Sequence, residues 1–135
     1  MTQKNNETKP VSIYEMPDGK KMVRVRTLDE DFLLDPNHID NGKNYEFDEA
    51  MERLKELSLT TFNKKQALII AVYHDEINKA IEVLDGDKLN WEWSVSEYNA
   101  TNAWYYNGNY GTVHSYGKYY TFQVRPIYKL NEDRR

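Results

Sequence analysis

The sequence predicts a mixed α+β domain, and three observations carry that prediction. An Asp-Gly pair separates two short alternating runs near the start, and two segments with helical spacing occupy the middle of the chain. Aromatic-rich runs separated by glycines fill the last third. A hairpin, then helices, then further strands is an order typical of α+β domains rather than of repeated β-α-β units.

The first expected element is a β-hairpin. Asp18 and Gly19 lie between two runs of alternating residues, and such a pair favours a tight turn because glycine accepts positive φ and aspartate tolerates it. The next stretch, residues 29–45, has turn chemistry at Asp35-Pro36 and Asn41-Gly42. We therefore expect a loop there.

Two helices are expected in the middle of the chain, near residues 46–57 and 64–84. The first has apolar residues at helical spacing, and an i,i+4 pair of Glu49 and Arg53 lies on its polar face. Asn63 and Gln66 predict a capping box at the start of the second. The dipeptide His74-Asp75 is expected to break or bend the second helix between its two halves.

From residue 91 onward we expect an antiparallel sheet. Gly108, Gly111 and Gly117 mark turns between runs rich in strand-forming residues. Within the last run, alternate residues are apolar, as in a strand with one buried face. The expected division is a polar arm at residues 1–10, one domain at 11–130 and a charged tail at 131–135.

Composition excludes several classes of function. The 135 residues contain no cysteine, which excludes disulfides, thiolate catalysis and cysteine-ligated metals. The net charge of −4 gives no electrostatic attraction to nucleic acid or to an anionic membrane. No apolar run is long enough to span a bilayer, and the first ten residues lack the apolar segment of a secretion signal. We therefore expect synthesis in the cytosol.

A tyrosine-rich segment without acidic residues, almost uncharged, interrupts this charged chain at residues 104–120. No Asp or Glu occurs between Tyr98 and Asn131, and eight of the eleven tyrosines lie in that stretch. Tyrosine offers a large, rigid contact area at low entropic cost, and Asn, Ser and Gly add adaptable hydrogen bonds. One interpretation is a binding face. The other is that these residues fill a core and a subunit contact, because aromatic residues also favour strands.

Several short stretches occur in a distinctive order along the chain: "EFDEAMERL", "FNKKQALIIAVY", "WSVSEY", "AWYY" and "VRPI". Together they cover residues 45–128, and their order resembles the Lcl-type (DUF1566) family of C-type-lectin-fold domains. Phe62-Asn63 departs from the Pro-Thr of the family pattern, and Val95 replaces a polar residue. The resemblance implies a C-type-lectin-like fold with two helices and a twisted antiparallel sheet.

The resemblance also implies a function in recognition. Relatives of this fold include phage receptor-binding proteins and proteins diversified by retroelements, whose last strands form a display surface. We therefore expect a non-enzymatic module on a phage virion that binds a glycan or protein through its Tyr/Asn-rich face. The alternatives are a capsid- or fibre-associated structural protein that uses this face for subunit contacts, and a bacterial adhesin-like domain.

Alternation along the strands separates candidate contact residues from candidate core residues. The expected core members are Trp104, Tyr106, Val113, Tyr120 and Phe122. Trp93, Trp104 and Arg125 are expected to be structural, with Arg125 tying loops together through carboxylates or carbonyls. The residues expected to form one exposed or partner-facing patch are Tyr105, Asn107, Asn109, Tyr110, His114, Tyr116 and Tyr119.

The sequence gives no support to a metal centre, a cofactor or an active site. His38, His74 and His114 fall in a loop, a helix and a strand without the spacing of metal ligands. The calcium motifs of sugar-binding lectins are missing, so binding is expected to be calcium-independent. No phosphate loop or nucleophile elbow is present. We expect no enzyme activity, and we expect other virion proteins or a cell-surface molecule as partners in an oligomer or larger assembly.

Overall fold

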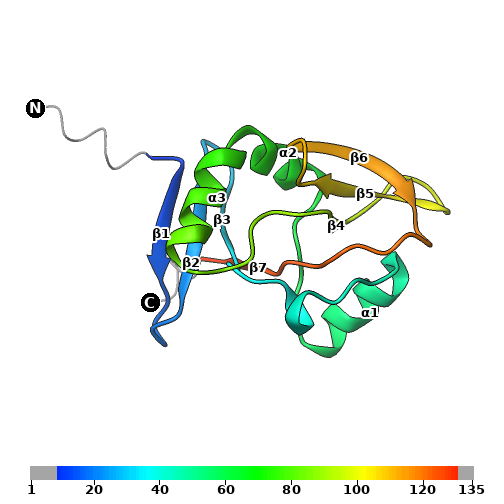
Figure 1. The fold of residues 1–135 in the computed structure, drawn as a ribbon, viewed down its shortest axis with the longest axis horizontal. Helices are drawn as coiled ribbons and strands as arrows, with labels where there is room; N and C mark the ends of the chain where they lie inside the picture. The colour runs from blue at the N-terminus through cyan, green and yellow to red at the C-terminus, as the bar shows by residue number, and fades with distance from the viewer. Residues whose placement is uncertain (1–8, 131–135) are drawn as a thin grey trace, which may run out of the picture.

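A computed structural model describes residues 9–130 of the chain. The expected tail at residues 131–135, and the expected arm apart from Lys9 and Pro10, lie outside the described residues. The elements follow in the order β1 (Val11–Glu15), β2 (Lys21–Arg26), β3 (Asp31–Leu34), the 3-10 helix η2 (Ile39–Gly42), α1 (Phe47–Glu56), α2 (Lys64–Val72), α3 (His74–Val83), β4 (Glu92–Glu97), β5 (Asn102–Asn107), β6 (Thr112–Gly117) and β7 (Ile127–Lys129) (Figure 1).

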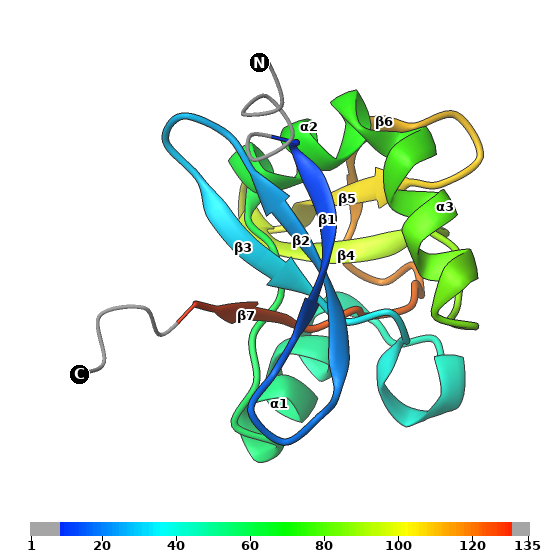
Figure 2. The same ribbon diagram turned by 90° about the vertical axis from the view of Figure 1, so that its left-hand side faces the viewer.

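The strands form two antiparallel sheets. The first has the order β1-β2-β3-β7, and the second has the order β4-β5-β6. The expected hairpin is confirmed as β1 and β2, with Gly19 at a φ of 93° in its turn. Figure 2 shows the strands of the first sheet crossing in front of the second sheet. The mixed α+β class is therefore confirmed.

Two expectations about the strands were wrong. The stretch at residues 29–45 is not wholly a loop, because β3 lies within it and pairs with β2 and β7. The strands after residue 91 do not form a single sheet, because β7 leaves β6 and joins β3. Four residues between acidic and Asp-Pro segments gave β3 little sequence signal, and one of its two pairing partners, β7, lies almost a hundred residues further along the chain.

The helices begin where the sequence predicts, although there are three α-helices in residues 9–130 instead of two. The side chain of Asn63 accepts a hydrogen bond from the backbone N–H of Gln66, and the Gln66 side chain accepts one in return from the Asn63 N–H. The expected bend is a full break at Tyr73, whose φ of −107° and ψ of 29° separate α2 from α3.

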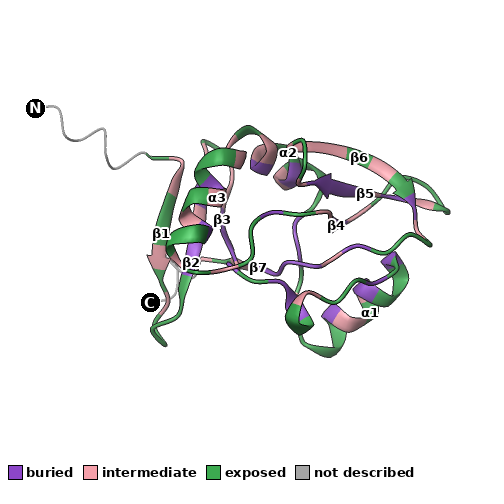
Figure 3. Cartoon of the chain, in the orientation of Figure 1, coloured by how far each residue is buried: buried purple, intermediate pink, exposed green. Residues whose placement is uncertain are grey.

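Strand β5 lies between two hydrophobic clusters. One cluster joins α2 and α3 to the first sheet and to Tyr106 of β5. The other joins α1 to β4, to Tyr105 of β5 and to Phe122. Figure 3 accordingly shows β5 as buried, while β6 beside it is mostly intermediate or exposed. This central strand has no solvent-exposed face.

A buried ion pair connects the two sheets. Arg125, which is fully buried, donates from Nε and Nη2 to the carboxylate of fully buried Glu92, with an Nη2–Oε2 distance of 2.9 Å. Arg125 also donates to backbone carbonyls, from Nη1 to Asp35 at 2.9 Å and from Nη2 to Asp87 at 2.7 Å, and its Nη2 lies 3.1 Å from Nε2 of His38. One side chain thus connects the end of β3, the loop before β4, β4 itself and the segment before β7.

His38 completes this cluster. Its Nε2 lies 2.7 Å from Oε2 of Glu92, which assigns the Nε2 proton to that contact. Burial by itself raises the pKa of the Glu92 carboxyl group, but the charge of Arg125 and the contact with His38 outweigh burial and lower the pKa to about 2. Glu92 therefore remains ionised in the interior.

Neutralising Glu92 should destabilise the fold and change its response to acid. Glu92→Gln leaves Arg125 buried without a counter-ion, and such a loss costs about 3–5 kcal/mol. Because folding lowers the pKa of Glu92 from 4.5 to about 2, its contribution is fully present above about pH 4.5 and is lost as the pH falls toward 2. Urea unfolding across this range should show a flatter pH dependence for Glu92→Gln than for the wild type.

Glu82→Gln is the matched control, because Glu82 is exposed on α3. It should leave both the free energy of unfolding at pH 7 and the acid profile nearly unchanged. Equal profiles for the two variants would contradict the assignment of this pH dependence to Glu92.

Candidate binding site

The tyrosine-rich segment at residues 104–120 forms the β5–β6 hairpin and the turn after β6. Strand β5 pairs with β6 over six consecutive residues, from Asn102 opposite Gly117 to Asn107 opposite Thr112. Because β5 is central and β6 lies at the edge, the two strands bury their aromatic residues to different extents. The candidate contact residues therefore fall into two groups.

Tyr105 and Asn107 were expected at the surface, and this expectation was wrong. Tyr105 is 5% exposed and its ring stacks on Phe122, with 4.6 Å between ring centroids. The buried Oδ1 of Asn107 accepts the backbone N–H of Asn109 at 2.9 Å in the hairpin turn. Alternation predicts an exposed face only where one side of a strand is uncovered, and both sides of β5 are covered.

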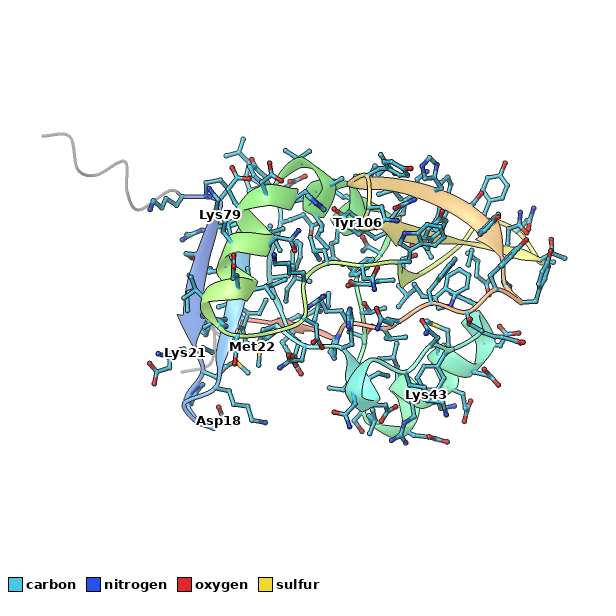
Figure 4. All side chains as sticks on the ribbon, viewed as in Figure 1. Asp18, Lys21, Met22, Lys43, Lys79 and Tyr106 are labelled. Atoms are coloured by element: carbon cyan, nitrogen blue, oxygen red, sulfur yellow. The ribbon has the colours of Figure 1, made fainter. Side chains whose placement is uncertain are left out.

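Two residues expected in the core lie closer to the surface. Trp104 is half-buried, with the Lys64 ammonium 4.0 Å from its ring centroid and the Tyr98 ring at its edge. Tyr120 is exposed on the turn that follows β6. Of the other expected core residues, Phe122 and Tyr106 are buried, and Val113 is partly buried against the first cluster. Tyr106, labelled in Figure 4, reaches His74 at the start of α3 through its hydroxyl group.

The exposed rings gather beyond β6. Tyr116 and Tyr120 stack with centroids 4.1 Å apart and planes 1° apart, and Tyr119 stacks on Tyr120 at 4.7 Å. On the inner side, Tyr116 lies 5.9 Å from the ring of buried Tyr105. We call Tyr116, Tyr119 and Tyr120 the tyrosine surface. It is an aromatic stack that begins in the core and ends in solvent.

Local geometry holds this stack in place. A Cβ atom on Gly117 would lie 2.7 Å from Cε2 of Tyr119, so only glycine permits that ring to fold back over the turn. The backbone N–H of Tyr120 donates to the carbonyl of Gly117 at 3.1 Å. The rings are therefore arranged by the backbone before any ligand arrives, which lowers the entropic cost of binding.

The tyrosine surface carries no net charge. Side-chain hydrogen bonding with Tyr116 and Tyr119 raises the pKa of Tyr120 to about 12, so its phenol stays neutral at physiological pH. The neighbouring Lys118 ammonium lies 3.1 Å from the Glu97 carboxylate, which balances it. Such a surface offers ring edges, the outer face of Tyr119 and a cluster of hydroxyl groups that both donate and accept.

The structure brings together only some of the expected contact residues. His114 and Tyr116 lie on the same face of β6, and His114 is exposed beside the ring of Tyr105. Asn109 and Tyr110 are exposed in the turn at the opposite end of β6. A six-residue strand separates that turn from Tyr119, a span of roughly 20 Å. The residues expected to form one patch therefore lie in two places, because Asn109 and Tyr110 lie in a turn that is separate from the tyrosine surface.

The residues expected to be structural occupy interior positions, with one exception. Trp93 is fully buried and its Nε1 donates to the carbonyl of Tyr45, while Arg125 makes the ion pair described above. Trp104 is the exception. Sequence reasoning did not single out Glu92, because a glutamate between two tryptophans in an alternating strand would ordinarily face solvent. Nor did it link His38 to that carboxylate.

The described part of the chain contains neither a metal-binding cluster nor a membrane-spanning helix. No group of three or more His, Cys, Asp or Glu side chains in residues 9–130 is placed to hold a metal ion. Every helix in these residues is too short or too polar to span a lipid bilayer. No protein-family model matches this chain, and no curated protein matches it. The resemblance to lectin-fold domains therefore stays a prediction.

Truncating Tyr105 and truncating Tyr119 should have opposite consequences. Tyr105→Ala removes a ring that is packed against Phe122 and Tyr116, and we expect a loss of about 3–5 kcal/mol in the free energy of unfolding. Tyr119→Ala removes a ring that is 70% exposed, and the loss should be about 0.5 kcal/mol or less. Urea denaturation of both variants measures the difference, and similar losses would show that the division into core and surface rings is wrong.

Proposed function

We propose that this domain is a non-enzymatic recognition module that binds a neutral glycan or a protein through the tyrosine surface. The observation that carries this proposal is the stack of Tyr116, Tyr119 and Tyr120, which is exposed and uncharged yet supported from the core by Tyr105 and Phe122. Rings that are fixed before binding lose little entropy on contact, and tyrosines combine an apolar face with a hydroxyl group.

The chemistry of the surface favours a neutral ligand. The hydroxyl groups of the three tyrosines can donate to and accept from the hydroxyl groups of a sugar or the backbone of a protein. The outer face of Tyr119 can stack on a sugar ring or on an apolar side chain. With Lys118 paired to Glu97, nothing in the tyrosine surface is suited to neutralise a strongly charged ligand.

A C-type-lectin-like arrangement and a virion location belong to the same proposal. Helices that precede a three-stranded antiparallel sheet, with the tyrosine surface at its last strand, support the lectin-like fold. The virion location rests on the sequence resemblance alone. A structural role in a capsid or fibre is the second candidate, and the exposed apolar side chains Leu68 and Val72 on α2 favour it.

Replacing the two outermost rings should abolish recognition without unfolding the domain. Tyr119→Ser with Tyr120→Ser removes the ring faces and two of the three hydroxyl groups, and we expect binding to weaken at least about tenfold, since central aromatic contacts each contribute more than about 1 kcal/mol. The readout is a glycan array together with capture of partner proteins by the immobilised domain. Tyr110→Ser is the control, because Tyr110 is equally exposed but lies in the distant turn. Unchanged binding by the double variant would end the proposal.

Binding should survive chelation. The stretch from Tyr98 to Asn131 contains no carboxylate, and the nearby Glu97 is paired with Lys118, so the tyrosine surface lacks the oxygen ligands that calcium requires. EDTA should therefore change neither the affinity for a ligand found by the array nor the melting temperature. A loss of binding that calcium restores would contradict this expectation.

A further inference from the structure

Strand β6 has a free edge without the usual protections. It is the last strand of the β4-β5-β6 sheet and runs along the border of the molecule (Figure 1). Its six residues pair with β5 in unbroken register, without a bulge. No charged residue and no proline occurs from Ala100 to Gly117. Natural proteins protect such edges with lysine, proline or bulges, because an open edge is a template for another strand.

The other edge strands in the described residues carry these protections. The pairing of β4 with β5 shifts register between Trp93 and Glu97. Strand β7 has only three residues, lies between Pro126 and Lys129, and bonds to Thr60 on its outer side. Strand β1 follows Pro10 and ends at Glu15. The open edge of β6 is therefore a local feature and not a general property of this chain.

The ladder with β5 determines which backbone groups of β6 are available. The N–H of Lys118 donates to the carbonyl of Thr101 at 2.8 Å, just beyond the pair of Asn102 and Gly117. Hydrogen-bonded and non-hydrogen-bonded pairs alternate along an antiparallel ladder. The N–H and C=O groups of Val113 and Ser115 consequently point away from β5, toward the open side.

We propose that β6 pairs with β6 of a second copy of this chain, antiparallel and about a two-fold axis, to form a continuous six-stranded sheet. Val113 bonds to Ser115 of the second copy and Ser115 to its Val113, and His114 lies opposite the second His114. The outward N–H and C=O groups of each strand find partners in the other strand, because these groups are placed symmetrically about His114. No charge along either edge opposes it.

Exposed apolar side chains beside β6 support a protein occupant. Helix α2 packs against β6, and residues 67–72 of that helix are all apolar. Leu68 is 47% exposed and Val72 is 71% exposed. A helix that is apolar on all sides is normally covered. The dimer would also place both copies of Tyr116 on one side of the joint sheet, because His114 and Tyr116 share a face. This goes beyond the proposed recognition, to which it would add avidity.

Single cysteines test the register directly, because the chain has none of its own. Opposite residues of a non-hydrogen-bonded pair have Cα atoms about 4.5 Å apart, within the range of a disulfide. His114→Cys should therefore convert to a disulfide-linked dimer under mild oxidation. Ser115→Cys is the matched control, since its two copies are displaced along the strands and face the other side of the sheet. Equal crosslinking of both variants, or none by His114→Cys, would overturn the proposal.

The molecular mass in solution gives a second test. Analytical ultracentrifugation of the wild-type chain should show a dimer, and Ser115→Pro should yield a monomer with little change in melting temperature, because the lost N–H points away from β5. If Ser115→Pro fails to fold, His114→Lys replaces it, since this places two like charges opposite each other at an exposed position. Ala100→Lys adds the same charge in a turn and should stay dimeric. A monomeric wild-type chain, or a dimeric His114→Lys, would refute the interface.

Discussion

The buried pair of Arg125 and Glu92 is the constraint on which the arrangement of the two sheets depends. Two charges removed from water are costly, and only close geometry and further hydrogen bonds offset that cost. Arg125 meets this condition by donating to the Glu92 carboxylate and to the carbonyls of Asp35, Asp87 and Lys88. The planar guanidinium fork accepts these partners only in fixed directions. Three stretches that are distant in sequence, around Asp35, Asp87–Glu92 and Arg125, are therefore held at one point.

The tyrosine surface depends on this point through a short stretch of backbone. Three residues upstream of Arg125, Phe122 pairs with Tyr45, and the carbonyl of Gln123 accepts the N–H of Trp93. With that segment held, the Phe122 ring lies under Tyr105, and Tyr105 in turn supports Tyr116. The outer rings are thus linked to the buried ion pair through a chain of packed aromatic groups. A rigid surface requires this kind of support from the interior.

Features that depend on neighbouring residues were predictable from the sequence. The burial of a residue by distant parts of the chain was not. The Gly19 turn and the reciprocal bonds of Asn63 and Gln66 depend on neighbouring residues, and they appear as expected. The burial of Tyr105 and Asn107 depends on how many faces of β5 are covered, which alternation along one strand does not encode. Similarly, β3 lies inside the first sheet because it pairs with β7 as well as with β2, and the contact with β7 is one of high sequence separation.

The sequence predicted the kinds of residue at the candidate site better than it predicted which of them are exposed. The segment without acidic residues coincides with the β5–β6 hairpin, and Tyr116 and Tyr119 are exposed as expected. Tyr120 was missed because it was assigned to the buried phase of a regular final strand. The chain instead turns at residues 117–120, where Gly117 lets Tyr119 fold back, and the strand alternation stops there. Gly117 was read as a turn residue, but the buried phase of the last strand was extended back to within three residues of it.

Strand β6 carries both Tyr116 and the open edge, with Tyr119 and Tyr120 in the turn that follows it. A strand that presents neutral rings to a ligand lacks the charged residues that ordinarily discourage edge pairing, because a charge within the strand would hold water at the contact. Lys118, just beyond β6, is paired with Glu97. Such a strand then needs another way to satisfy its outward N–H and C=O groups. Solvent does so at the risk of aggregation, whereas pairing with an identical strand closes the edge. A neutral binding strand at the border of a sheet is therefore most stable when a second copy pairs with it, and the proposed two-fold axis through His114 places such a copy beside β6.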